Sequence, residues 1–309
     1  MDILSIILIV LGLILFETVS SIDNAIINAQ VLSTMKEWAR RWFLLWGLII
    51  GVFLVRGILP FIIVWVTNTS LSPVEVITAT FSNDPHVLES IEASSPILLI
   101  GGGTFLIFLF FHWLFMEPKR FGLRGEGFFM RQGVWFYAVI SVILTLIVWF
   151  SLKINPFMAL GAVIGSTAFF ITHGFKQNAE TAEEKLLSSN QSDISKIFYL
   201  EVIDATFSID GVLGAFAFTL SIPLILLGNG LGAIVVRQVT VSNIDRIKKY
   251  VYLKNGAMYS ILFLGLIMVL ESFGVPIPPW FSPVITFAVV GYFFLKSKLE
   301  LSRNPDVSI

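Results

Sequence analysis

Runs of about 20 apolar residues recur along the whole chain, and they limit what it can fold into. In a lipid bilayer every backbone polar group needs a partner within its own segment, so such runs cross the membrane as helices. Hydrophobic residues make up 56% of the sequence and charged residues 13%, which is far from the composition of soluble domains. The sequence predicts an all-α polytopic membrane protein, with residues 1–309 as one transmembrane domain in a lipid bilayer. The nine predicted spans are 3–32, 43–66, 95–116, 133–152, 156–175, 195–219, 222–242, 253–274 and 281–297.

The basic residues predict how these spans are oriented. If the N-terminus is outside, 17 of the 20 Lys and Arg residues fall in inside segments and only Lys153 falls outside, while Arg56 and Arg237 lie within apolar runs. Such a split follows the positive-inside rule. We therefore expect an N-out, C-in protein. Residues 67–94 are predicted to be an outside connection and residues 176–194 a cytoplasmic loop.

Several chemistries are excluded by what the sequence lacks. There is no cysteine, so disulfides, thiolate metal sites and cysteine nucleophiles are excluded. There is no nucleotide-binding loop motif, and we expect no cofactor and no nucleic-acid partner. His112 and His173, near the inner ends of two spans, are interpreted as ordinary interfacial histidines. The glycines at 101–103 are predicted to let helices approach closely.

Carboxylates interrupt two of the apolar runs, although a charged side chain is costly inside a bilayer. One run contains FETVSSIDNAI (16–26) and the other contains LEVIDATFSIDGVLGAF (200–216). The polar residues of these motifs that could serve an ion site are Glu17, Asp23, Asn24, Glu201, Asp204 and Asp210.

The two acidic runs are related by an internal repeat. Superposing their Ser-Ile-Asp tripeptides pairs Asp23 with Asp210 and Glu17 with Asp204. In the predicted topology the two runs cross the membrane in opposite directions. Inverted repeats of this kind are typical of secondary transporters, whose substrates bind near the midplane. The repeat halves cover about residues 1–66 and 195–242.

The next span of each half contains an arginine, Arg56 or Arg237, as the last residue of the shared pattern Gly-x3-Gly-x4-Arg. Both arginines are predicted to form structural ion pairs. The four repeat carboxylates and two arginines leave a net charge of −2, which one divalent cation would neutralise. All nearby candidate ligands are oxygens, including the amides of Asn28 and Asn229, and such sites suit Mn²⁺, Mg²⁺ and Ca²⁺.

Helix geometry restricts how the acids could act together. Residues six apart lie about 9 Å apart along a regular helix axis, so the two acids of one half cannot chelate one ion from an unbroken helix. Either the helices are broken near Ser20–Ser21 and near Gly211, or the acids form successive stations on a path. Counting from the span ends places Asp23 towards the inside and Asp210 towards the outside.

Both motifs resemble the TerC family of integral membrane proteins, in which an acid and Asp-Asn lie in the first span and an E-x-x-D…F-S-x-D run lies in a later one. The resemblance covers both motif spans and the helices that follow them. It implies manganese export or tellurium resistance, and it implies that the six polar residues of the motifs are ion-pathway residues. At Gly211 this chain differs from that family, which frequently has Ser there.

Two other classes of function stay open. A membrane-embedded partner or biogenesis protein of the tellurium-resistance type would bind no metal. An intramembrane aspartyl hydrolase would use Asp23 and Asp210 as a dyad sharing one proton. The acids as a set favour a transporter rather than an enzyme. We predict Mn²⁺ export in exchange for protons, with Glu17 and Asp204 accepting the protons, by a chain that could form a homo-oligomer.

Overall fold

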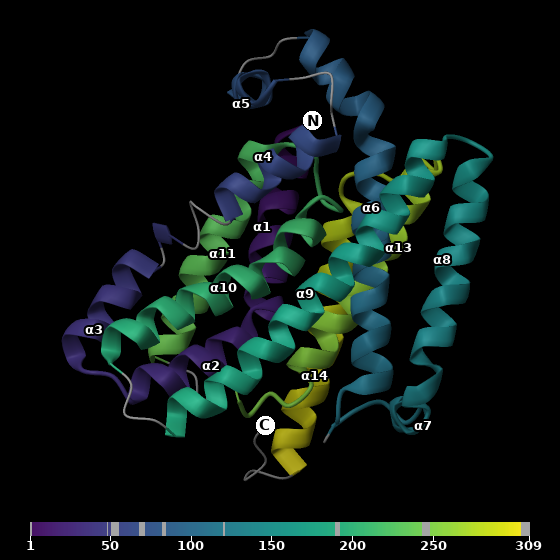
Figure 1. The fold of residues 1–309 in the computed structure, drawn as a ribbon. Helices are drawn as coiled ribbons and strands as arrows, with labels where there is room; N and C mark the ends of the chain where they lie inside the picture. The colour runs from purple at the N-terminus through teal and green to yellow at the C-terminus, as the bar shows by residue number, and fades with distance from the viewer. Residues whose placement is uncertain are drawn as a thin grey trace.

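The computed structural model describes residues 2–47, 49–50, 56–67, 72–81, 85–119, 121–188, 192–242 and 248–303. Within these ranges the regular structure is helical throughout, which confirms the predicted class (Figure 1). The thirteen α-helices are α1 (Ile3–Ser20), α2 (Ile22–Ser33), α3 (Glu37–Trp42), α4 (Arg56–Thr67), α5 (Pro73–Phe81), α6 (Pro85–Met116), α7 (Glu126–Arg131), α8 (Phe136–Leu152), α9 (Pro156–Ser188), α10 (Asp193–Ala215), α11 (Ile222–Ser242), α13 (Leu253–Ser272) and α14 (Phe281–Arg303). A π-helical segment, η1 (Phe43–Gly47), and a 3₁₀ segment, η3 (Gly133–Trp135), complete the regular structure there.

Five helical segments of the described chain are long and apolar enough to cross a membrane. They are Ile3–Ser20, Glu92–Met116, Gly133–Leu152, Pro156–Asn178 and Leu253–Ser272. Two shorter apolar segments are Arg56–Val66 and Ile222–Gln238. The chain is therefore a multi-pass membrane protein by helix length and composition. Nine crossings, the N-out orientation and the inverted repeat stay predictions.

Three predicted segments differ from the structure in their continuity. The first predicted span is divided at Ser21 into α1 and α2. The predicted loop 176–194 is helical as far as Ser188, because α9 continues well beyond its apolar part. The predicted connection 67–94 contains α5 and the first turns of α6, although residues 68–71 and 82–84 lie outside the described ranges.

Glycines allow α6 to pack closely between α9 and α13. A Cβ atom on Gly165 of α9 would lie 2.0 Å from the carbonyl oxygen of Gly101. On another side of α6, a Cβ atom on Gly103 would lie 2.8 Å from the carbonyl oxygen of Gly265 in α13. Any side chain at these positions would force the helices apart. The prediction that the glycines at 101–103 permit close helix packing is confirmed.

Close packing of the same kind joins α1 and α11. A Cβ atom on Gly228 would lie 2.4 Å from Cβ of Leu13, and one on Gly232 would lie 2.6 Å from Cβ of Glu17. Helix α10 also contacts α1, α2, α4 and α11. The acidic helices α1, α2 and α10 therefore lie together with α4 and α11 on one side of the bundle, beside α6, α9 and α13 (Figure 1).

Candidate functional site

The break between α1 and α2 lies at Ser21, which has φ −90° and ψ 5°. Its backbone N–H donates to the carbonyl oxygen of Glu17 at 3.1 Å, and its hydroxyl donates to Oε1 of Glu17 at 3.0 Å. The break therefore directs hydroxyl and backbone donors at Glu17. One of the two alternatives required breaks near Ser20–Ser21 and near Gly211 together. The first break is present, and the second is absent because α10 is continuous there.

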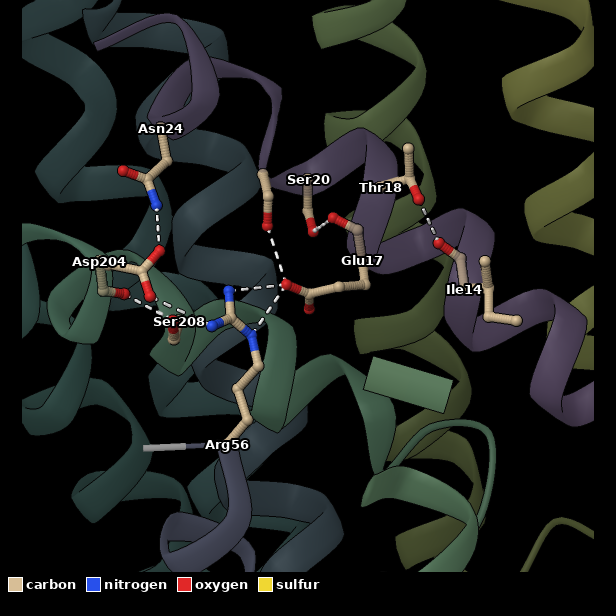
Figure 2. Close-up of polar contacts among 9 residues, drawn as sticks. Ile14, Glu17, Thr18, Ser20, Asn24, Arg56, Asp204 and Ser208 are labelled. Atoms are coloured by element: carbon tan, nitrogen blue, oxygen red, sulfur yellow. Dashed lines mark hydrogen bonds and ion pairs between the residues drawn. The ribbon is translucent and has the colours of Figure 1, made fainter. Parts of the chain in front are cut away.

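Arg56 lies between two carboxylates at the centre of the site (Figure 2). Its Nε donates to Oε1 of Glu17 at 2.9 Å, and its Nη2 lies 2.8 Å from the same oxygen. Its Nη1 donates to Oδ2 of Asp204 at 3.2 Å. The side chains of Glu17 and Arg56 are 1% and 5% exposed, and that of Asp204 is 20% exposed. The structure thus forms the ion pair predicted for Arg56.

Asn24 and Ser208 complete the surroundings of Asp204 (Figure 2). Nδ2 of Asn24 donates to Oδ1 of Asp204 at 2.7 Å, which ties α2 to α10. The hydroxyl of Ser208 donates to the backbone carbonyl of Asp204 at 2.5 Å. Three predicted site residues from three helices, Glu17, Asn24 and Asp204, are therefore brought together around one guanidinium.

Asp23 and Asp210 belong to other ion pairs. Oδ2 of Asp23 lies 2.8 Å from Nζ of Lys254, which also lies 2.6 Å from Oε2 of Glu117. Oδ2 of Asp210 accepts from Nζ of Lys176 at 2.5 Å. The two carboxylates of the aspartyl dyad, the minor alternative, thus each have a lysine partner.

The two lysine partners of these acids were not predicted from the sequence. Lys176 and Lys254 were counted as inside-segment charges, and no motif linked either of them to an acid. The contact between Lys176 and Asp210 makes two predictions incompatible: an inside position for Lys176 and an outward position for Asp210.

Glu201 and Arg237 belong to none of the close ion pairs described above. Within the described ranges, no carboxylate lies within 4 Å of the Arg237 guanidinium. Arg237 does lie within electrostatic range of Glu201. On its other side Glu201 faces η1, where a Cβ atom on Gly47 would lie 2.3 Å from Oε1 of Glu201. The close ion pair predicted for Arg237 is not made with any described residue.

Gly211 lies against the free oxygen of Glu17. A Cβ atom at this position would lie 2.6 Å from Oε2 of Glu17. Gly232 of α11 presses on the Cβ and Cγ atoms of the same side chain. Two helices therefore approach Glu17 through glycines, and this gives a physical reason for Gly rather than Ser at position 211.

Seven buried side-chain atoms in the described part of the chain have no hydrogen-bond partner. All seven belong to α1, α2, α10 or α11, and six are oxygens. Unpartnered buried polar atoms are rare in folded proteins and call for an explanation. The atoms are Glu17 Oε2, Asn24 Oδ1, Asn28 Oδ1, Glu201 Oε1, Asp210 Oδ1, Asn229 Oδ1 and Asn229 Nδ2.

The described residues do not form a ready-made metal cage. No group of three or more His, Cys, Asp or Glu side chains among them could hold a metal ion. The physical reason at the central pair is the guanidinium of Arg56, which takes the position between Glu17 and Asp204 that a cation would need. A cation that binds these carboxylates has to compete with Arg56 and to use the amide oxygens around them.

Comparison with known proteins identifies one family. The model described as "Protein of unknown function (DUF475)" matches residues 22–304. No curated protein and no solved structure matches the chain.

Proposed function

We propose that this chain, which belongs to the DUF475 family, transports a divalent cation across a membrane. The observation that carries the proposal is the set of six unpartnered buried oxygens on α1, α2, α10 and α11. A carboxylate or amide oxygen buried without a donor is costly, and a cation supplies the missing positive partner. Carboxylate and amide oxygens are ligands that hard divalent cations prefer.

The charges of the surrounding residues support a divalent rather than a monovalent ion. Six carboxylates and four basic side chains, taken from three separate ion-pair groups and from Glu201 and Arg237, leave a net charge of −2 when all are ionised. One divalent cation neutralises that charge within the bundle. The carboxylates are those of Glu17, Asp23, Glu117, Glu201, Asp204 and Asp210, and the bases are Arg56, Lys176, Arg237 and Lys254.

Arg56 has a definite part in the proposed cycle. It offsets one of the two negative charges of Glu17 and Asp204 when no cation is bound, so this group keeps a charge of −1 when both acids are ionised. Proton uptake by Glu17 and Asp204 stays a prediction. The unpartnered oxygens of Glu17, Glu201 and Asp210 are places where a cation could be exchanged for a proton, because no donor occupies them.

The identity of the ion, the direction and the membrane rest on the resemblance to TerC proteins. That resemblance supports Mn²⁺ export by proton antiport in a bacterial plasma membrane. It includes Glu17, Asn24 and Asp204, which are the three predicted residues gathered around Arg56.

The test is Mn²⁺ uptake by the purified protein in sealed liposomes, compared with uptake of Mg²⁺, Ca²⁺ and Zn²⁺. We expect Mn²⁺ flux above that of protein-free liposomes. Asp204→Asn should lower the flux at least about tenfold, because an amide keeps the shape but loses the charge that attracts the cation. The matched control is Glu37→Gln, which neutralises an acid whose side chain is 71% exposed and should transport normally.

Each result separates the transporter from the other classes. Absence of flux and of bound metal for all four ions would contradict transport and favour a membrane-embedded partner protein. Equal flux in the Asp204→Asn and Glu37→Gln variants would place the cation path elsewhere in the molecule.

A further inference from the structure

A cavity lies at the end of the bundle where α10 ends and α11 begins. Its volume is about 660 Å³, and the connection between α10 and α11 and that between α13 and α14 form much of its wall. Glu92 of α6 and Glu271 of α13 also line it, and neither makes a close ion pair with a residue of the described ranges. A hollow lined by negative charge raises the local concentration of cations. We call this cavity the acidic chamber.

Phe218 joins the wall of the acidic chamber to the interior of the bundle. Its side chain lines the chamber and is 4% exposed. Its ring also packs against that of Phe16 in α1, with ring centroids 5.8 Å apart and planes tilted by 42°. Phe16 is 1% exposed. Two aromatic rings therefore follow one another inward from the chamber.

Glycines allow the two rings to fit between α1 and α10. A Cβ atom on Gly12 of α1 would lie 2.8 Å from Cε1 of Phe218, and one on Gly214 of α10 would lie 2.5 Å from Cε1 of Phe16. Each phenylalanine thus packs on a glycine of the other segment. In both segments the phenylalanine follows the glycine by four residues, in GLILF (12–16) and GAFAF (214–218). The contact between the two segments is therefore reciprocal.

The order of contacts along α10 places the two rings between the chamber and Glu17. The unpartnered Oε2 atom of Glu17 lies against Gly211. Phe16 lies against Gly214, which is three residues further along α10, or about 4.5 Å along the helix axis. Phe218 follows the end of α10 and lines the chamber. A cation that moves between the chamber and Glu17 along this segment has to pass both rings.

We propose that Phe16 and Phe218 form a hydrophobic gate that closes the acidic chamber off from the carboxylate of Glu17. Constrictions lined by apolar side chains exclude water and thereby stop hydrated ions. Both rings are buried and in contact, so the gate is closed in this structure. The control of the cation by this gate rests on the proposed transport function, whereas the barrier to water and small ions does not.

The barrier is tested with Ag⁺, a small thiol-reactive cation, and without Mn²⁺. The chain has no cysteine, so one introduced cysteine is the only thiol. Ser221→Cys reports on the chamber, which Ser221 lines, and Ser21→Cys reports on the far side of the gate, because the Ser21 hydroxyl bonds to Glu17. Ag⁺ is added to sealed membrane vesicles of uniform orientation, on the side from which Ser221→Cys reacts. Cysteines left unreacted are counted with a fluorescent maleimide after purification in detergent.

From that side we expect Ser21→Cys to react at least about tenfold more slowly than Ser221→Cys, because the closed rings exclude hydrated Ag⁺. This comparison needs no substitution of either phenylalanine. Equal reaction rates at the two positions would show that no barrier separates them and would overturn the inference.

Opening the gate by substitution assigns the barrier to the two rings. Phe16→Ala and Phe218→Ala should each raise the reaction rate of Ser21→Cys at least about tenfold, since an apolar layer is lost. Phe293→Ala is the matched control, because Phe293 of α14 is 3% exposed and packs on Tyr259 instead. It should leave the rate unchanged. Phe218→Leu removes the ring contact, keeps an apolar side chain and should change the rate in the same direction if the alanine variants do not stay folded. An unchanged rate in the folded variants would overturn the gate.

Control of the cation is tested with Mn²⁺ in sealed liposomes without a pH gradient. Phe218→Ala should let Mn²⁺ run down its own gradient at least about tenfold faster than the wild type, and Phe293→Ala should match the wild type. If Mn²⁺ neither binds nor crosses in any protein, the proposed function fails, and the Ag⁺ rates still decide whether the rings form a barrier. If the wild type transports Mn²⁺ and Phe218→Ala adds no flux, the cation site stands and the gate is overturned.

Discussion

Single residues stabilise the central carboxylates, and substitution of Arg56 tests this most directly. Arg56→Gln would leave Glu17 and Asp204 without their cationic partner in the protein interior. Removing one member of a buried ion pair typically costs about 3–5 kcal/mol. We expect a destabilisation of that order, measured as the free energy of unfolding in detergent.

A comparison with a surface pair makes the Arg56 result specific. Arg41→Gln breaks the surface ion pair between Arg41 and Glu37. Their side chains are 78% and 71% exposed, and exposed ion pairs contribute about 1 kcal/mol or less to the free energy of unfolding. Adding Glu17→Gln to Arg56→Gln should recover part of the lost stability, because fewer buried charges remain. Equal stability of the Arg56→Gln and Arg41→Gln variants would show that Arg56 does not stabilise the central carboxylates.

Gly211 is the second residue at which a single added carbon atom tests the site. In Gly211→Ala the new methyl group would lie 2.6 Å from Oε2 of Glu17, so the carboxylate has to turn away. Because Ser21 and Arg56 hold the other oxygen, we expect a destabilisation of about 1–3 kcal/mol together with weaker Mn²⁺ binding. Gly291→Ala in α14 is the control, since its new Cβ atom meets nothing within 4 Å. It should gain about 0.5–1 kcal/mol from better helix propensity. If Gly211→Ala raised the free energy of unfolding by a similar amount, the Glu17 side chain would be able to move aside without loss of stability.

At the scale of whole helices, the packing of α6 against α9 depends on backbone contact. Gly165→Ala would place a methyl group 2.0 Å from the carbonyl oxygen of Gly101, and backbone cannot turn aside as a side chain does. We expect a loss of at least about 2 kcal/mol in the free energy of unfolding. Gly174→Ala lies on the same helix with nothing within 4 Å of its Cβ atom and should be neutral or stabilising. If both variants unfold alike, the close approach of α6 and α9 is not needed for stability.

The sequence predicted features that depend on local composition. Apolar runs predicted the helices and the small residues at 101–103 predicted close packing, while the break near Ser20–Ser21 belonged to one of two alternatives. What it could not predict was which helices face each other. The partners of Asp23 and Asp210 are Lys254 in the first turn of α13 and Lys176 in the interior of α9, and no motif links either lysine to its acid. The helical extension of α9 to Ser188 was missed because its polar residues were interpreted as a loop.

At the scale of the whole molecule, the proposed transport function predicts that stability depends on a bound cation. The acids and bases counted above leave a net charge of −2 when all are ionised, and without a cation no member of this set neutralises that charge. A cation that binds only the folded protein stabilises it, by about 2.7 kcal/mol when its concentration is 100 times the dissociation constant. The alternative partner protein, which binds no metal, would show no such gain.

We therefore expect added Mn²⁺ to raise the thermal unfolding temperature of the purified protein, with a shift that grows with Mn²⁺ concentration. The shift should be smaller at lower pH, because carboxylates that take up protons lose the charge that binds the cation. Asp204→Asn should abolish most of the shift, whereas Glu37→Gln should keep it, since Asp204 lies in the network and Glu37 is on the surface. Comparison of Mn²⁺ with Mg²⁺ and Ca²⁺ at equal concentrations then ranks the ions without any transport assay. An unfolding temperature that ignores all three ions in wild-type protein would remove the charge argument for a divalent substrate, because a network that binds the cation cannot leave the folded state unaffected by it.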